Sequence, residues 1–276
     1  MSLSIRTNIA SLNAQRNLSS TQGTLDSSMS RLSSGYRITK AGDDAAGLGI
    51  STKLESQIRS YAQASRNAND GLSVIQSTES ALNESANILT RLRELAMQSA
   101  SDGIGNTERG YVQQEATSLV DELERIAQVT EYNGTKLLTG GQTLDFQVGI
   151  ANSTNDKITF TSVNATTATG TGLGVTGLSL ASKASAQGAL QTIDAALASV
   201  SNARSTLGAA GNRLESSIRN IQAFAESLSA ANSRIKDVDI AEETSRMSRA
   251  QILAQSGVSV LAQANQQPQL ALKLLG

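Results

Sequence analysis

The sequence predicts a mainly α-helical protein, a long helical coiled-coil bundle built from both chain ends, with a small β-hairpin and loop insert. Aromatic residues make up only 3% of the 276 residues and tryptophan is absent, so aliphatic residues and alanine must fill the core. The single proline is Pro268, so no earlier position carries the residue that breaks helices. Apolar residues recur every three or four positions through most of the chain, which is the period of an amphipathic helix.

The first helical stretch lies in the N-terminal forty residues. Its apolar positions are separated mostly by threes, fours and their sums: Ile5, Ile9, Leu12, Leu18, Leu25, Met29 and Leu32. The segment SSGYRITKAGDDAAGLG follows, and its glycines and aspartates predict a connector rather than continuous helix. Its central residues are Gly42, Asp43, Asp44 and Gly47. We expect the two aspartates to cap the next helix, because negative charge is favoured at a helix N-terminus.

A second helix is predicted from about Ile50 to Ala100, roughly 75 Å at the usual rise per residue. Residues 101–105 (SDGIG) end it, and a shorter helix containing Val112, Leu123 and Ile126 reaches the Asn133-Gly134 turn signal.

Residues 141–180 change in character. Alternating apolar residues at 144–150, and again at 158–160, predict a β-hairpin. The segment VNATTATGTGLGVTG that follows is rich in threonine and glycine, and with little to bury it is expected to be an exposed loop.

The C-terminal half returns to helical spacing. A heptad-like stripe runs from Leu190 to Ile235, more than six repeats, which predicts helices wound around partner helices. The last forty residues remain helix-prone, and Pro268 weakens the pattern only near the end. The middle of the chain offers nothing obvious to cover the two terminal seams, so their expected partners are each other and then further copies of the chain.

Composition excludes several functional classes. Histidine and cysteine are absent, so the catalytic systems that need them are impossible. We expect no enzyme, no metal and no cofactor. The formal net charge of −1 provides no field for nucleic acid. No stretch reaches the roughly 18 apolar residues of a membrane span, and the first residues lack the apolar stretch of a signal peptide.

One helix face could be a contact patch. In TRLRELAMQ (90–98), Leu89, Leu92 and Ala96 are expected to face the bundle, with Arg91 and Leu95 nearer the opposite side. The alternative is an ordinary solvated face, although an outward leucine beside arginine suits a partner.

Four stretches together resemble bacterial flagellin, the filament protein of the bacterial flagellum. They are IRTNIASLNAQRNL, RLSSGYRITKAGDDAAGLGIS, EYNGTKLL and VLAQANQQPQLALKLLG. Their order and their spread over both termini and the connector make the resemblance specific, and it covers the chain outside roughly 141–185.

The resemblance implies that the protein is a structural subunit of the extracellular flagellar filament, a helical homopolymer used for motility. Residues 1–45 with 236–276 would form a terminal coiled-coil inner-core domain, and 46–235 a helical shell domain with the hairpin insert at about 141–180. The inner-core seam would contain Ile5, Ile9, Leu12, Leu18, Leu25, Leu261 and Leu270. Export would use the flagellar type III apparatus without a cleaved signal peptide. The other partners would be an export chaperone, the filament cap and hook-associated junction proteins.

The resemblance also implies recognition by host Toll-like receptor 5. The family pattern resembles QRxRELAxQ, so Arg91 and Leu95 match, and Glu115 lies at the third position on the next helix. Thr90 departs from the family's glutamine. Two alternatives stay open, a hook–filament junction protein and a cytoplasmic coiled-coil scaffold. An enzyme on the same frame would need catalytic residues that 141–185 does not contain.

Overall fold

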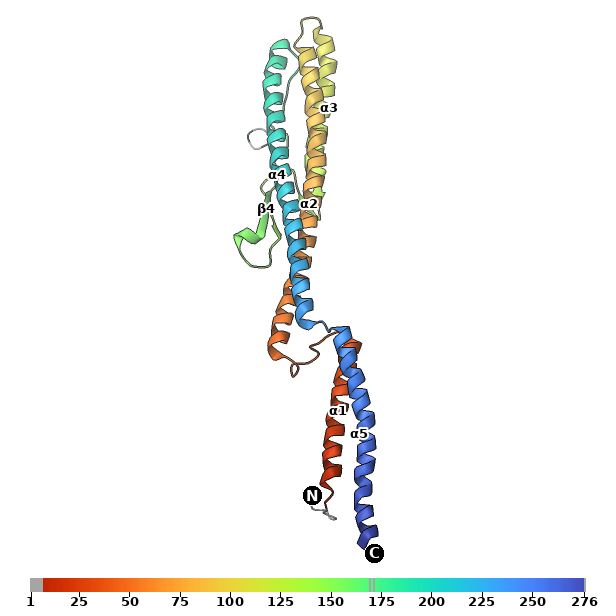
Figure 1. Ribbon diagram of the computed structural model, residues 1–276. Helices are drawn as coiled ribbons and strands as arrows, with labels where there is room; N and C mark the ends of the chain where they lie inside the picture. The colour runs from red at the N-terminus through yellow and green to blue at the C-terminus, as the bar shows by residue number, and fades with distance from the viewer. Residues whose placement is uncertain (1–6, 169, 171, 276) are drawn as a thin grey trace. The chain divides into compact units, whose positions relative to one another are not determined.

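The computed structural model describes residues 7–168, 170 and 172–275, and Figure 1 traces the five helices and small sheets that they form. The helices are α1 (Ile9–Ser34), α2 (Ala45–Ser99), α3 (Asn106–Val129), α4 (Lys183–Lys236) and α5 (Ile240–Leu275). The chain divides into two compact units, one made of Met1–Ile58 with Glu226–Gly276 and one of Arg59–Ala225. The predicted fold class, mainly helical with a small β insert, is confirmed. The assignment of 1–45 with 236–276 to an inner core and of 46–235 to a shell stays a prediction.

In the first unit, α1 and α5 lie side by side and run in opposite directions (Figure 1). The Asn8 side chain caps α1 by accepting a hydrogen bond from the Ser11 amide at 3.0 Å. Gly35 ends α1 in the left-handed conformation (φ 74°), which glycine adopts readily. Asp239 caps α5 by accepting from the amides of Ala241 and Glu242. Helix α5 continues through Pro268 to Leu275.

The two connectors of this unit meet. The Arg37 amide donates to the Lys236 carbonyl at 2.6 Å, and the Val238 amide donates to the Gly35 carbonyl at 3.0 Å. Ile38, which lies in the first connector, is buried. Four residues from two distant parts of the chain are therefore held together by backbone hydrogen bonds.

The helix after the first connector starts earlier than the glycines predicted. Asp44 Oδ1 accepts the Gly47 amide at 2.8 Å, so α2 begins at Ala45 and Gly47 lies in its first turn. A side chain at Gly47 would collide with Asp44 and Ile38. Its glycine is required by close packing, and the connector itself ends at Asp44, with Gly42 exposed within it.

The second unit packs α3 and the long parts of α2 and α4 around a core of aliphatic side chains, as the apolar stripes predicted. Its fully buried large side chains include Leu82, Leu89, Leu92, Leu123, Ile193, Leu207 and Leu214. Arg109 is buried where α2 turns into α3, and its guanidinium donates to the carbonyls of Ser99 and Ser101.

Two small antiparallel pairs lie in the second unit. Strands β1 (Glu131–Tyr132) and β2 (Thr135–Lys136) flank Asn133 and Gly134, whose positive φ angles suit a tight hairpin turn. Strands β3 (Thr143–Gln147) and β4 (Lys157–Thr161) pair with Phe146 opposite Ile158, and the short 3-10 helix η1 (Thr154–Asp156) connects them. This is the predicted hairpin. Its Phe146 ring lies so close to Gly71 of α2 that a Cβ there would be 2.9 Å from Cγ of the ring.

The threonine- and glycine-rich segment is not the exposed loop that its composition predicted. Ala165, Leu173 and Val175 are buried in the core of the second unit. Glu124 of α3 accepts hydrogen bonds from the Thr167 amide at 2.7 Å and the Thr167 hydroxyl at 2.8 Å. Gln113 of α3 holds Leu178 and Leu180 by their backbones. The segment thus combines hydrogen bonds within itself, such as that from the Thr176 hydroxyl to the Thr167 carbonyl, with contacts to side chains of α3.

The contact between Glu124 and Thr167 should make the stability of this segment depend on pH. Hydrogen bonds from Gln128, and then from Thr167, lower the pKa of Glu124 below its ordinary value of 4.5. A carboxyl with a lowered pKa stabilises the folded state above the unfolded value, and this stabilisation is lost as pH falls through the folded value. We expect the stability difference between the unaltered chain and Glu124→Gln to be constant at neutral pH and to shrink below about pH 4.5. Urea unfolding from pH 3 to pH 7 would measure it, and a constant difference would contradict the assignment.

Candidate functional site: the paired terminal helices and the Arg91 patch

The pairing of α1 and α5 uses one seam on each helix. On both helices the least exposed residues follow alternating steps of three and four, the spacing of a coiled coil. These positions, called the terminal seam below, are Ser11, Ala14, Leu18, Thr21, Leu25, Ser28 and Leu32 on α1, and Glu243, Met247, Ala250, Ala254, Gly257, Leu261 and Ala264 on α5.

Small side chains dominate the terminal seam and let the helices approach closely. A Cβ added at Gly257 would lie 3.3 Å from Cδ1 of Leu18. Near the N-terminus of α1, the Asn8 amide group donates to the Ala264 carbonyl at 2.8 Å, and the Ser11 hydroxyl donates to Asn265 Oδ1 at 2.7 Å. The pair is therefore held by hydrogen bonds as well as by apolar contacts.

The structure places only some of the predicted seam residues between α1 and α5. Leu18, Leu25 and Leu261 lie on the terminal seam. Ile9 and Leu12 do not, because each lies one or two residues from the seam position Ser11 and both are exposed. Ile5 lies outside the described residues, and so does the side chain of Leu270.

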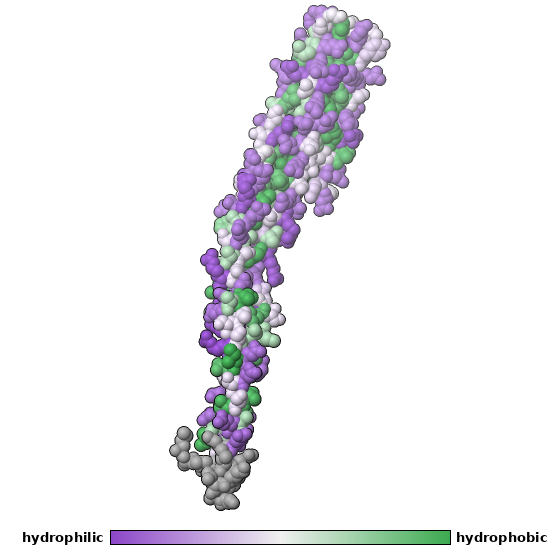
Figure 2. Space-filling model, turned by 45° about the vertical axis from the view of Figure 1, so that its right-hand side comes forward, coloured by the Kyte–Doolittle hydropathy of each residue, from purple (hydrophilic) through white to green (hydrophobic). Residues whose placement is uncertain are grey.

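Apolar side chains remain exposed around the helix pair. They are Ile9, Leu12 and Met29 on α1, and Ile240, Ile252, Leu253, Val258 and Val260 on α5. Figure 2 shows hydrophobic surface interspersed with polar surface along this unit. These eight exposed large apolar residues on the two helices are available for contact with another protein.

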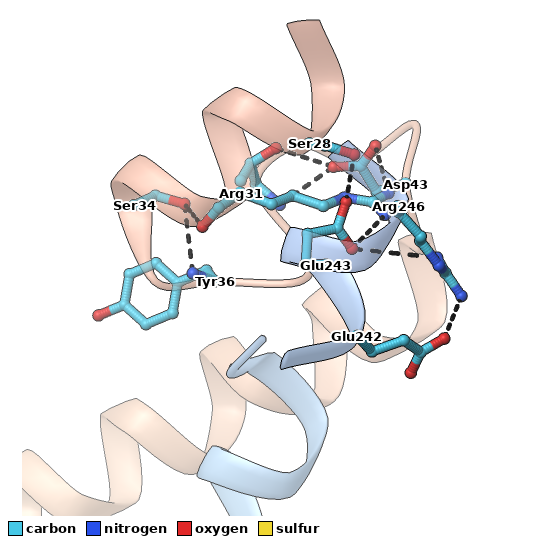
Figure 3. Close-up of polar contacts among 9 residues, drawn as sticks. Ser28, Arg31, Ser34, Tyr36, Asp43, Glu242, Glu243 and Arg246 are labelled. Carbon is cyan, nitrogen blue, oxygen red and sulfur yellow. Dashed lines mark hydrogen bonds and ion pairs between the residues drawn. The ribbon is translucent and has the colours of Figure 1, made fainter. Parts of the chain in front are cut away.

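A buried polar cluster lies at the connector end of the terminal seam (Figure 3). Glu243 is 4% exposed, and its Oε1 accepts the Ser28 hydroxyl at 2.6 Å. Arg31 Nη1 is 3.9 Å from Glu243 Oε2, and Arg31 Nη2 is 3.7 Å from Asp43 Oδ1. The arginine therefore joins α1 to both α5 and the connector.

Asp43 is held by the connector rather than by a helix N-terminus. Its Oδ2 accepts hydrogen bonds from the Thr39 amide and hydroxyl and from the Lys40 amide. These bonds, Thr39's first, lower the pKa of Asp43 below its ordinary value, with a smaller contribution from Arg31. Of the two predicted capping aspartates, only Asp44 caps α2.

The spacing of apolar residues does not predict the contacts among Ser28, Arg31 and Glu243. One signal was present: a glutamate begins the 3-4 spacing of α5 at a position otherwise taken by small or apolar residues. A charged residue at such a position is uncommon in a coiled coil and often has a specific partner on the facing helix.

Arg91 and Glu115 meet on the surface of the second unit. Arg91 Nε and Nη2 donate to Glu115 Oε1 at 3.0 and 2.9 Å, and Nη1 donates to Glu94 Oε2 at 2.9 Å. The hydrogen bond to Glu115, followed by that to Glu94, raises the pKa of Arg91 further above its ordinary value. These side chains are about half exposed, so a partner can reach them.

The expectation that Leu95 lies on the outer side is wrong. Leu95 is 2% exposed and belongs to the core of the second unit. The reason is the width of the buried face of α2, which packs against both α3 and α4 and so buries positions 88, 89, 92, 95 and 96. Leu95 lies one helical turn from Arg91 along α2 and presents almost no surface of its own.

The helices described are not long and apolar enough for any of them to cross a bilayer. Two surfaces of the described residues are open to contact with other proteins: the exposed apolar residues beside the terminal seam, and the Arg91–Glu115 patch.

Known proteins resemble this chain along nearly its whole length. Residues 5–143 match the bacterial flagellin N-terminal helical region, and residues 190–275 match the bacterial flagellin C-terminal helical region. A flagellin from Halalkalibacterium halodurans is 43% identical over 272 residues, covering 98% of this chain and 99% of the relative. The flagellin of Bacillus subtilis is 40% identical over 306 residues, again with 98% and 99% covered.

A solved structure agrees with this result. The crystal structure of Bacillus cereus flagellin is 28% identical, with a TM-score of 0.50 over 56% of this chain and 88% of that one. The four sequence stretches, the paired terminal helices and these matches lead to one conclusion: the chain belongs to the bacterial flagellin family, structural proteins of the flagellar filament.

Proposed function

We propose that this chain polymerises into the flagellar filament through its terminal helices, which pair within each subunit and then pack against neighbouring copies. The exposed apolar side chains around the terminal seam are the main support for this proposal. An isolated two-helix pair that leaves so much apolar surface in water is poorly stabilised, and contact with further copies would bury it. Ile9 and Leu12, which lie off the terminal seam, would then contact other subunits.

Seeded growth tests this proposal. We expect the purified chain to elongate short filament seeds into filaments of micrometre length, measured by light scattering and electron microscopy. A chain that adds only a few copies per seed would favour a hook–filament junction protein. A chain that adds none, and that stays inside the cell instead of appearing in sheared filaments, would favour the scaffold alternative.

We further propose the partners that accompany a filament subunit. The chain would leave the cell through the flagellar type III apparatus, with an export chaperone bound to its C-terminal segment, and would fold beneath the filament cap. The family membership and the exposed apolar residues of α5 support these roles. Such a segment needs cover before assembly, because exposed apolar surface promotes aggregation.

We also propose that the patch of Arg91, Glu115 and the nearly buried Leu95 is recognised by Toll-like receptor 5. The direct hydrogen bonds between Arg91 and Glu115 support a single patch formed by α2 and α3. An exposed arginine held in one orientation by carboxylates is a favourable anchor for a protein partner.

A further inference from the structure

The apolar residues of the terminal seam specify the register of α1 against α5 only weakly. Most of its positions are alanine, glycine, serine or threonine, whose short side chains allow few distinctive contacts. Because both helices repeat every seven residues, a slip by one heptad again places seam positions opposite seam positions. Leu18 would then face Ala250 or Ala264 in place of Gly257. Apolar packing alone therefore discriminates weakly between registers.

Glu243 is the exception along this seam. Its carboxylate is buried and receives the Ser28 hydroxyl at 2.6 Å, while the guanidinium groups of Arg31 and Arg246 each come within 3.9 Å of its second oxygen. Figure 3 shows these side chains converging from α1 and α5. A buried carboxylate is tolerated only where donors and opposite charge surround it.

A slipped register removes those partners. If α5 moves by one heptad in one direction, Glu243 faces Thr21; in the other direction it faces Gly35, where α1 has ended. In both cases the carboxylate leaves Ser28 and Arg31. Pairing of α5 with α5 of another copy also gives Glu243 neither partner. Each wrong pairing thus leaves Glu243 with only Arg246 of its own helix as a charge partner, and the loss of Ser28 and Arg31 discriminates against such a pairing.

We propose that the cluster of Ser28, Arg31 and Glu243 is the register determinant of the terminal helix pair, selecting the in-register pairing of α1 with α5 over slipped and homotypic pairings. A single buried polar residue can set the register of a coiled coil in this way. Through Arg31 the same cluster contacts Asp43, so it fixes the pair relative to the connector. The inference rests on the proposed function, in which the paired terminal helices build the filament.

The test uses the absence of cysteine from the sequence. Ser11→Cys with Asn265→Cys reports the native register, because these two side chains are hydrogen-bonded at 2.7 Å. Ser11→Cys with Val258→Cys reports a slip of one heptad. Each pair is introduced into the full chain and oxidised mildly, both in filaments grown from seeds and before assembly. On a non-reducing denaturing gel, a monomer band that migrates faster than the reduced chain reports a link within one chain, and a band of dimer mass reports a link between two copies.

In the otherwise unaltered chain we expect the native link to exceed the slipped link at least tenfold. Glu243→Leu retains the bulk and needs no donors, so this ratio should fall by about tenfold or more, a change of at least about 1.4 kcal/mol in preference. Ser28→Ala leaves the carboxylate in place and should lower the ratio by less. The matched control is Asp26→Asn, which changes an exposed carboxylate of α1 outside the cluster and should leave the ratio unchanged.

The proposal is overturned if Glu243→Leu and Ser28→Ala both give the same ratio as Asp26→Asn. If Glu243→Leu does not assemble, its ratio of native to slipped link is measured in the unassembled chain, and the ratio for Ser28→Ala is measured in filaments as a second test. Seed elongation is a separate result. Normal elongation with an unchanged ratio removes the register determinant alone, whereas failure of the otherwise unaltered chain to elongate removes the proposed function.

Discussion

Deletion of residues 240–276 is expected to leave a helical, unassembled chain that cannot elongate filament seeds. The deletion removes α5 and with it half of the terminal seam and five of the exposed apolar residues. The 26 residues of α1 would then lack a partner, and helices in proteins gain most of their stability from such packing. The second unit has its own core, which contains no residue from 240–276, so most of the helix should persist.

Circular dichroism and seeded light scattering measure the two parts of this prediction. Helical signal should fall by roughly the contribution of α1 and α5 and retain that of α2, α3 and α4, while elongation should drop below detection. The chain offers a matched control in Ser248→Ala with Ser256→Ala, two exposed polar positions of α5, which should elongate normally. Elongation of the truncated chain at the full-length rate would remove the terminal helices from the assembly mechanism.

Replacement of Arg91 by alanine should weaken Toll-like receptor 5 signalling by at least tenfold. An arginine that anchors an interface contributes about 2 kcal/mol or more when truncated, which exceeds the roughly 1.4 kcal/mol of a tenfold change. The substitution removes the charge and also frees Glu115 and Glu94, the two carboxylates that Arg91 now holds. A receptor reporter assay over a range of protein concentrations gives the shift.

The control for Arg91 is Arg125→Ala, because Arg125 is also an exposed arginine paired with a carboxylate, Glu122 of the same helix. Equal signalling by the Arg91 and Arg125 variants would contradict the patch assignment.

Leu95→Ala requires a different interpretation, because this side chain is buried. Truncation of a buried leucine destabilises a protein by about 2–5 kcal/mol. A loss of signalling would then reflect a change in the packing of α2 in the core of the second unit. Unfolding curves must establish that the variant is folded in the assay.

The differences between prediction and structure have a common cause. Leu95 was expected outside because a single stripe was assigned to α2, but two neighbouring helices bury a wider face than one seam. The segment 163–177 was expected to be exposed because its own residues offer little to bury, but Ala165, Leu173 and Val175 join the core and Glu124 of α3 holds Thr167. Helix α2 begins inside the glycine-rich stretch because Asp44 caps it. In each case the outcome depends on a contact with a residue that is distant in the sequence, or on a hydrogen bond that forms only with one particular backbone conformation.

The terminal helices give the clearest division between what the sequence determined by itself and what only the tertiary structure decided. Apolar spacing and the near absence of proline were enough to predict long helices and complementary ends, because helical periodicity is a local property. The sequence also determined the family, through four stretches in a fixed order. Spacing alone could not decide which side chains of α1 and α5 face each other, because several registers satisfy the same seven-residue repeat. In the structure, one register is adopted, in which Glu243 is buried between Ser28 and Arg31. This contact forms only when the connectors bring the two helix ends together, so it is a property of the tertiary structure.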